Sequence, residues 1–408
     1  MFEIRENNQL IKVWLGSEEE LPENCKAQAV RLLSLPSVYK WVCLMPDTHV
    51  GKGMPIGGVL ATKDIIVPEA VGVDIGCGMN FVSTNIKLEE MKGILTDNGT
   101  LIQAIIGRIM RTVPVGREKH AVKQPCNVLE RVYSDPEGYR DYPELYAVLE
   151  DGYYQIGTLG GGNHFIELQE DEEGYLCIMI HSGSRHIGSA VCEYFDKVAM
   201  EENLHEKNSI AINSALPYLH CNSSIGQAYI KWMHLAMEYA FENRKRMMEN
   251  VKQCVKAVLE KFLSKEVVFS KDINCHHNYA ALETHYGEQV WVHRKGAIKA
   301  MPGELSVIPG SMGSYSYVVE GKGNKESFCS ASHGAGRTYS RMSAMENFSA
   351  QQVMEDLKER GVVLGAKKKY KVAEECRFAY KDIEEVMDQQ RDLVVPVKRL
   401  KTVGVIKG

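Results

Sequence analysis

Glu69-Ala-Val-Gly-Val-Asp-Ile-Gly-Cys-Gly-Met-Asn80 is the stretch around which the rest of the chain is organised. It follows the strand-like run Ile65-Ile66-Val67 and places Asp74 three residues before Cys77. The glycines between and around these two residues permit a tight turn, because glycine adopts backbone angles that other residues resist. A carboxylate and a thiol on one such turn can point at a common centre. The stretch therefore predicts half of a metal site, still without its imidazoles.

Composition sets the class of protein. The chain has 408 residues, of which 44% are hydrophobic and 25% charged, as expected for a soluble globular protein with a sizeable core. A net charge of −5 excludes a globally basic nucleic-acid-binding protein but allows a local basic face. Eleven cysteines without a C-x-x-C pair favour reduced thiols and a cytoplasmic location. With no leader-like start and no long apolar run, we expect neither a signal peptide nor contact with a membrane.

Hydrophobic periodicity predicts an α+β fold. Apolar residues recur at helical spacing over 88–112, 189–206 and 225–264. We interpret the stripe on the last of these as core. We expect a mixed β-sheet core with peripheral helices, and a loop at 207–224 that makes residues 190–265 a helical-hairpin excursion. Functional-looking turns are spread from 46 to 337 without a linker, which predicts one domain over 1–408.

Glycine-rich turns carry most of the remaining polar residues of interest. The loop at 46–58 presents Asp47, either as a functional residue or as the cap of a plain turn. The turn at 157–167 carries Asn163 beside three consecutive glycines, whose N–H groups can approach a phosphate. It lacks the spacing of a P-loop or of a dinucleotide fingerprint.

Imidazoles for the metal site come from three places at the ends of strand-like runs. They are His164, His181 and either His276 or His277. With Asp74 and Cys77 they form a set of five donors, which suits two metal ions better than one. Structural zinc sites usually draw four ligands from closely spaced pairs, so a set this widely spaced favours a catalytic centre. Imidazole and thiolate favour zinc, while the carboxylate allows manganese.

His333 stands apart from this set, in Ser-His-Gly-Ala-Gly-Arg. An imidazole flanked by backbone amides and a guanidinium is suited to attack on a phosphorus atom, because those groups stabilise developing charge. The alternative is a histidine that caps the start of a helix.

Seven motifs in register resemble the RtcB family, the GTP- and manganese-dependent RNA ligases that join a 3′-phosphate or 2′,3′-cyclic phosphate end to a 5′-hydroxyl end. They are Asp-Ile-Gly-Cys-Gly-Met (74–79), Gly-Asn-His-Phe-Ile-Glu (162–167), His-Ser-Gly-Ser-Arg (181–185), Cys-His-His-Asn-Tyr (275–279), Pro-Gly-Ser-Met-Gly (309–313), Ser-His-Gly-Ala-Gly-Arg (332–337) and the terminal Lys-Gly. The resemblance extends from about residue 40 to the last residue. It implies RNA repair or transfer-RNA splicing as the function.

The resemblance also assigns roles. The five metal donors would hold two Mn²⁺ ions bridged by Cys77, with His277 chosen over His276 because the family's ligand directly precedes an asparagine. His333 would take GMP from GTP, Arg185 would bind an RNA phosphate, and Asp47 would lie near the reacting hydroxyl. The guanylate pocket would comprise Asn163, His164, Phe165, Ile166, Glu167, His277, Asn278, Pro309, Gly310, Ser311, Met312, Ser316, His333, Gly334, Ala335, Gly336 and Lys407, with Tyr380 as a further contact of the base.

Several questions stay open at this stage. The partners implied are GTP and RNA ends; which RNA is joined and whether an activating protein is needed are not implied. His186 replaces a glycine found in many relatives, and we expect its side chain to point to solvent. One rival is a metal-dependent cyclic phosphodiesterase that does not ligate. The other is a structural zinc protein that binds RNA without chemistry.

Overall fold

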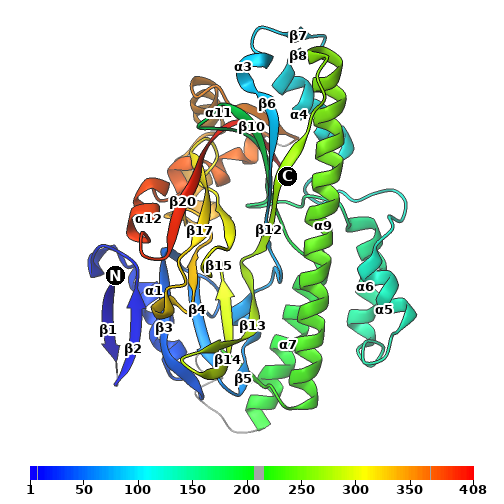
Figure 1. The fold of residues 1–408 in the computed structure, drawn as a ribbon. Helices are drawn as coiled ribbons and strands as arrows, with labels where there is room; N and C mark the ends of the chain where they lie inside the picture. The colour runs from blue at the N-terminus through cyan, green and yellow to red at the C-terminus, as the bar shows by residue number, and fades with distance from the viewer. Residues whose placement is uncertain (7, 206–215, 368) are drawn as a thin grey trace.

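The computed structural model describes residues 1–6, 8–205, 216–367 and 369–408. Helices and strands are mixed along the whole chain, so the α+β prediction is confirmed. The long helix α9 (Ser224–Leu263) runs along most of the length of the molecule, beside the strands (Figure 1). In the part of the chain that is described, no helix combines the length and the apolar character needed to cross a membrane.

A six-stranded sheet contains the N-terminal part of the chain and one hairpin from its middle. Its strands, in spatial order, are β1 (Phe2–Glu6), β2 (Gln9–Val13), β3 (Val38–His49), β4 (Ile56–Thr62), β14 (Glu288–Lys295) and β13 (Asn278–His285). The pair β2 and β3 is parallel and the other neighbours are antiparallel. Parallel neighbours need a crossover, which is supplied by α1 (Glu23–Leu33). This sheet places β3, which carries Asp47 near its end, next to β18 (Ser330–Ser332), which ends directly before His333.

The second large sheet carries most of the candidate ligands. Its strands, in order, are β12 (Phe269–His276), β6 (Gly78–Lys87), β10 (Tyr175–Ser182), β9 (Phe165–Asp171), β20 (Val394–Lys407), β17 (Tyr315–Gly321) and β16 (Leu305–Ile308), with β19 (Val363–Ala366) parallel to β20. Side chains alternate between its two faces. Ile166 and Ile180 pack with α9 and with α4 (Leu101–Thr112), while Phe165 and Met179 pack on the opposite face.

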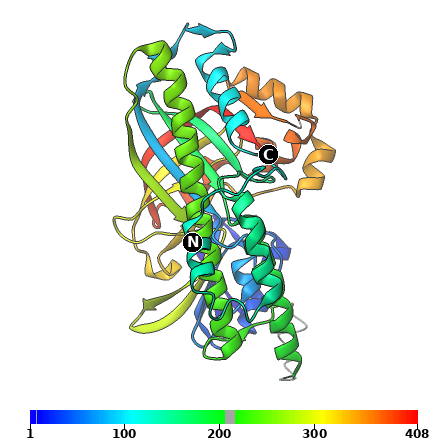
Figure 2. The same cartoon turned by 90° about the vertical axis from the view of Figure 1, so that its right-hand side faces the viewer.

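The other elements are short or peripheral. They are α2 (Pro68–Val71), α3 (Leu88–Met91), α5 (Asn127–Ser134), α6 (Pro143–Gln155), α7 (Arg185–His205), α10 (Arg341–Asn347), α11 (Ala350–Glu359), α12 (Ile383–Gln389), the strands β5 (Ile65–Ile66), β7 (Leu95–Thr96), β8 (Gly99–Thr100), β11 (Leu219–His220), β15 (Ala297–Lys299) and β18 (Ser330–Ser332), and the 3₁₀ turns Glu18–Glu20, Lys325–Ser327, Lys369–Glu375 and Arg377–Ala379. Helices α5 and α6 stand against α7 and α9, on the side away from the sheets (Figures 1 and 2).

Two of the three helices expected from periodicity are present. The stretches 189–206 and 225–264 correspond to α7 and α9, which pack against each other. The single helix expected over 88–112 is wrong, because β7 and β8 form a hairpin that interrupts it before Thr100 caps α4. The predicted loop at 207–224 lies partly outside the described residues, and its described end contains β11 paired with β5.

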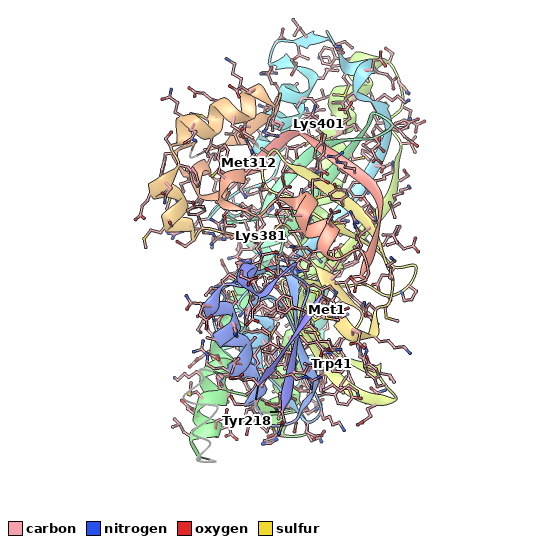
Figure 3. All side chains as sticks on the ribbon, turned by 90° about the vertical axis from the view of Figure 1, so that its left-hand side faces the viewer. Met1, Trp41, Tyr218, Met312, Lys381 and Lys401 are labelled. Carbon is pink, nitrogen blue, oxygen red and sulfur yellow. The ribbon has the colours of Figure 1, made fainter. Side chains whose placement is uncertain are left out.

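The C-terminal end of β3 is tied to the C-terminal part of the chain, and it contains Asp47, which was expected on a loop. Lys381 lies at the narrow waist between the N-terminal sheet and the lobe that carries α10 and α11 (Figure 3). Its Nζ donates to the carbonyl oxygen of Pro46 at 2.7 Å, directly before Asp47. Residues from both halves of the chain therefore meet at one place, and the candidate site lies there.

Candidate active site

The strands of the second sheet bring the candidate ligands to the same end of the sheet. Cys77 directly precedes β6, His181 lies near the end of β10, His277 directly follows β12, and His164 directly precedes β9. His181 in β10 pairs with Met79 in β6, and Met79 lies two residues after Cys77. The strand register therefore places His181 beside Cys77. The three histidines lie 87 to 200 residues after Cys77 in the chain and are its neighbours because antiparallel strands pair.

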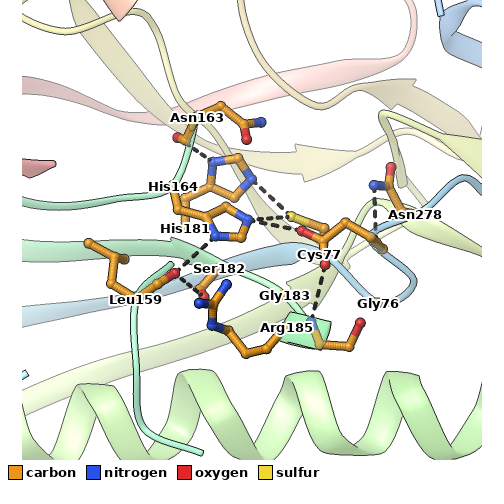
Figure 4. Close-up of polar contacts among 12 residues, drawn as sticks. Gly76, Cys77, Leu159, Asn163, His164, His181, Ser182, Gly183, Arg185 and Asn278 are labelled. Carbon is orange, nitrogen blue, oxygen red and sulfur yellow. Dashed lines mark hydrogen bonds and ion pairs between the residues drawn. The ribbon is translucent and has the colours of Figure 1, made fainter. Parts of the chain in front are cut away.

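The donor atoms of this cluster lie within contact of one another (Figure 4). The Sγ of Cys77 is 3.4 Å from Nε2 of His164 and 3.2 Å from Nε2 of His181. The Nε2 of His164 is 2.9 Å from Oδ2 of Asp74, and the Nε2 of His181 is 3.3 Å from that of His277. The thiol and the three imidazoles are buried. Among the described residues, Cys77, His164 and His181 form the group with the spacing of a metal site.

Backbone carbonyls orient two of the rings. His164 donates from Nδ1 to the carbonyl of Leu159 at 2.9 Å, and His181 donates from Nδ1 to the carbonyl of Asn163 at 3.2 Å. A neutral imidazole with its proton on Nδ1 presents a lone pair on Nε2, as metal-ligating histidines do. Both lone pairs then face Cys77, whose thiol has a single proton to share. This excess of lone pairs fits a divalent cation, and the N, S and O donors suit zinc or manganese.

Burial controls the protonation of the cluster. It lowers the pKa of His181 and of His277 well below the usual value, so both rings are neutral at physiological pH. It raises the pKa of the Cys77 thiol well above the usual value. Burial would also raise the pKa of Asp74, but its neighbours His164, Cys77 and Arg185 together outweigh this effect and the pKa is lowered. Binding of a cation to this set would therefore release the thiol proton.

His333 is held by a buried carboxylate beside the cluster. Its Nδ1 donates to Oδ2 of Asp47 at 2.6 Å, and its backbone N–H donates to the same oxygen at 3.1 Å. Asp47 is fully buried. The ring centroid of His333 lies 4.7 Å from that of His277. With Nδ1 engaged, the unshared nitrogen of His333 is Nε2, which is free to act as a nucleophile.

A cavity of about 720 Å³ opens beside His333 and His181. Of the residues predicted to bind the guanylate, those that line it are Asn163, Phe165, Glu167, Pro309, Gly310, Ser311, Met312, His333, Gly334, Ala335, Gly336 and Lys407, joined by Tyr380. Such a volume is in the range of small-molecule sites. The structure thus gathers four glycine-rich or polar motifs around one space.

Some predicted pocket residues lie elsewhere. His164 and His277 belong to the donor cluster. Asn278 donates from Nδ2 to the carbonyl of Asp74 at 3.2 Å, so it supports the ligand turn. Ser316 lies beneath the wall of the cavity, where its Oγ accepts from the N–H of Gly310 at 3.1 Å. The side chain of Ile166 faces the core on the α9 side of the sheet, because its two neighbours in β9 face the cavity.

Glu167 is the buried acidic group of the cavity wall. Its Oε2 accepts from Nε2 of Gln169 at 2.7 Å and from Oγ1 of Thr402 at 3.1 Å. These two bonds leave Oε1 available to a ligand. Burial raises the pKa of Glu167 to about 7. Its ionisation therefore changes within the physiological pH range.

Comparison with known proteins identifies the family to which the chain belongs. A family model described as tRNA-splicing ligase RtcB matches residues 28–408. The chain belongs to the RtcB family of RNA ligases. It is therefore an enzyme. The RNA-splicing ligase RtcB of Escherichia coli (strain K12) is 37% identical over 405 residues, which cover 98% of each chain. The tRNA-splicing ligase RtcB of Pyrobaculum aerophilum is 30% identical over 475 residues, which cover 98% of this chain and 95% of that one.

Arg185 occupies a strained position in this RtcB-family chain. Its φ is 56°, in the left-handed region, where a residue other than glycine costs about 1–3 kcal/mol. Its guanidinium donates to Oγ1 of Thr158 at 3.1 Å and to the carbonyl of Gly116 at 3.2 Å. Arg185 does not line the cavity beside His333. The neighbouring His186 has an exposed side chain, as expected.

Three charged residues of the cavity wall are new to the site. Glu375, which is buried, accepts from Nη1 of Arg337 at 3.1 Å and from Nε of Arg341 at 3.3 Å, and its Oε2 lies 3.8 Å from Nζ of Lys407. Arg337 ends one of the family motifs, so its sequence position was a usable signal. Glu375 and Arg341 lie outside the motifs, and only tertiary packing brings them to the cavity.

Proposed function

We propose that the protein joins RNA 3′-phosphate or 2′,3′-cyclic phosphate ends to 5′-hydroxyl ends, using GTP, in RNA repair or transfer-RNA splicing. The reaction would pass through GMP bound covalently to His333 and then through an RNA(3′)pp(5′)G end. The observation that carries this proposal is the Asp47–His333 pair at the cavity wall, 4.7 Å between ring centroids from the ligand His277. A nucleophile, its orienting carboxylate and a cation site are thereby adjacent.

The five donors Asp74, Cys77, His164, His181 and His277 would hold two Mn²⁺ ions, with the central Cys77 between the two groups of ligands. When bound, such cations neutralise phosphate charge and act as Lewis acids toward phosphoryl oxygens. The chain itself prepares the donors, because the carbonyls of Leu159 and Asn163 fix the two rings.

His333 would attack the α-phosphorus of GTP through Nε2, forming an N–P bond while pyrophosphate leaves. The imidazole becomes cationic as this bond forms. Asp47 stabilises that charge because its carboxylate accepts a hydrogen bond from Nδ1–H, and a second hydrogen bond, from the backbone N–H of His333, holds the carboxylate in place. The guanylate would then pass to the RNA 3′-phosphate oxygen, and the incoming 5′-hydroxyl oxygen would displace GMP from that phosphorus.

Recognition of guanine rests on Glu167. A guanine edge presents N1–H and the 2-amino group as donors, whereas the same edge of adenine offers an acceptor at N1. The free Oε1 of an ionised Glu167 accepts from such donors. Phe165, in the same strand, lines the cavity and offers an aromatic surface to the base.

The test is a guanylation assay. Purified protein is incubated with Mn²⁺ and GTP labelled at the α-phosphorus, and we expect a covalent label that His333→Ala abolishes. Adding RNA with a 2′,3′-cyclic phosphate and RNA with a 5′-hydroxyl should give joined product. A cyclic phosphodiesterase would instead open the cyclic end without joining and would not need His333. Absence of the labelled protein under these conditions would refute the proposal.

A further inference from the structure

Helix α9 reaches the candidate metal centre through one fully buried basic residue. Arg244 lies on the face of α9 that packs against the second sheet, and its side chain has no solvent exposure. Its Nη1 donates to the carbonyl of Gly76 at 2.8 Å and to the carbonyl of Ser182 at 3.0 Å. Its Nε donates to Oδ1 of Asn274 at 2.8 Å. One guanidinium therefore contacts three separate segments of the chain.

Each of these segments carries a candidate ligand. Gly76 directly precedes Cys77, and Ser182 directly follows His181. The third segment is the end of β12, where Nη2 of Arg244 lies 3.1 Å from Nδ1 of His276, the residue before His277. The same Nδ1 is 2.9 Å from the carbonyl oxygen of Gly76, so His276 either donates to that carbonyl or accepts from Arg244.

Asn243, the preceding residue on α9, binds the segment that orients the remaining ligand, His164. The Oδ1 of Asn243 accepts from the N–H of Gly157 at 2.7 Å and of Thr158 at 3.2 Å. The next residue, Leu159, provides the carbonyl that orients His164. Asn243 also donates to the carbonyl of Gly183 at 3.0 Å. Two adjacent side chains of one helix thus hold the segments of four ligands.

The charge of Arg244 is not needed for its hydrogen bonds. Its acceptors are two backbone carbonyls and a side-chain amide oxygen, and burying a cation among neutral groups is unfavourable. Burial lowers the pKa of Arg244 to about 10, so the side chain is still cationic at neutral pH. The nearby carboxylate of Asp74, and the Cys77 thiol once it has lost its proton, favour this charge. A neutral side chain would suffice for packing alone, and the fork geometry of arginine suits simultaneous contact with several carbonyls.

We propose that Arg244 is a positioning residue that sets the spacing of the metal ligands by tying the segments of Cys77, His181 and His277 to α9. The inference rests on the proposed metal centre. It predicts that changing Arg244 weakens metal binding without unfolding the protein.

The experiment measures metal binding alone, without GTP or RNA. Arg244→Lys keeps the charge but loses the fork, and Arg244→Met keeps the length without charge or donors. Lys245→Met is the matched control, since Lys245 is the adjacent cation of α9 and is exposed. Circular dichroism and thermal unfolding of the metal-free proteins establish that each variant is folded. Titration with Co²⁺ then gives the affinity and the charge-transfer band of a thiolate bound to cobalt.

We expect both Arg244 variants to bind Co²⁺ about 10- to 100-fold more weakly, as for other residues that support metal ligands, and to lose or shift the band. Lys245→Met should match the wild type. If Arg244→Met does not fold, Arg244→Lys alone decides the question. Wild-type affinity and an unchanged spectrum in a folded Arg244→Lys variant would overturn the inference. A wild-type protein that binds no Co²⁺ would instead overturn the metal centre itself, and this inference with it.

Discussion

The carboxylate of Asp47 offers the sharpest test of the proposed nucleophile. Asp47→Asn keeps the shape of the side chain but removes its charge. In the native protein both N–H groups of His333 donate to a single oxygen, Oδ2, and the other oxygen is buried without a hydrogen-bond partner among the described residues. The asparagine oxygen can replace Oδ2 and retain both bonds. The variant therefore isolates the contribution of the charge.

The magnitude follows from the chemistry of the step. A hydrogen bond to a charged group contributes about 1.5–3 kcal/mol, and the carboxylate is needed most when the imidazole becomes cationic. Because about 1.4 kcal/mol is a factor of ten in rate, Asp47→Asn should slow guanylation of His333 by roughly 10- to 150-fold.

The assay is single-turnover formation of the labelled protein at saturating GTP and Mn²⁺. Asp392→Asn serves as the control, because Asp392 accepts from the indole of Trp14 at 3.0 Å and does not line the cavity. Metal affinity and thermal stability are measured on both variants. Guanylation of Asp47→Asn at the wild-type rate, with metal binding unchanged, would refute the orienting role of Asp47.

Three other perturbations test separate parts of the site and the fold. Burial raises the pKa of Glu167 to about 7, so its carboxyl group is mostly protonated at pH 6 and mostly ionised at pH 8. Calorimetry should therefore show that GTP binds about tenfold more tightly at pH 8 than at pH 6. The affinity of Glu167→Gln for GTP should not depend on pH in this way. Cys77→Ser removes the central donor, so equilibrium dialysis should show Mn²⁺ affinity reduced by at least about tenfold. Glu283→Gln breaks the buried pair with Arg294, whose Nη1 donates at 2.7 Å, and should lower the free energy of unfolding in urea by about 3–5 kcal/mol. Burial would raise the pKa of Glu283, but Arg294 outweighs it and holds the pKa well below the usual value. The pair therefore contributes fully to the free energy of unfolding above the unfolded-state pKa of about 4.3, and this contribution is lost as the pH falls toward the lowered folded-state pKa. The Glu283→Gln variant should not show this loss.

The turns that carry the candidate ligands are recognisable in the sequence because each is a local pattern. A glycine-flanked donor at the end of a strand, as at Cys77 or His181, is visible within a few residues. What local patterns do not contain is strand order, and the pairing of β10 with β6 brings these two residues together. The same limit applies to Asp47: neither its place in β3 nor its bond to His333, 286 residues away, is visible in the local sequence.

The support of the site was harder to predict, and α9 shows why. Trp232, Ala236, Tyr239, Asn243 and Met247 follow one another at spacings of three or four residues, so Asn243 occupies a core position of an otherwise apolar stripe. A polar side chain at such a position must find partners inside the protein, because burying it unpaired costs free energy. A helical pattern that is judged by its hydrophobic residues alone does not reveal this need for hydrogen-bond partners. Asn243 and Arg244 are adjacent polar residues on the buried face of α9 and need hydrogen-bond partners there. They therefore indicate polar groups beneath the helix, which in this protein belong to the turns that carry the candidate ligands.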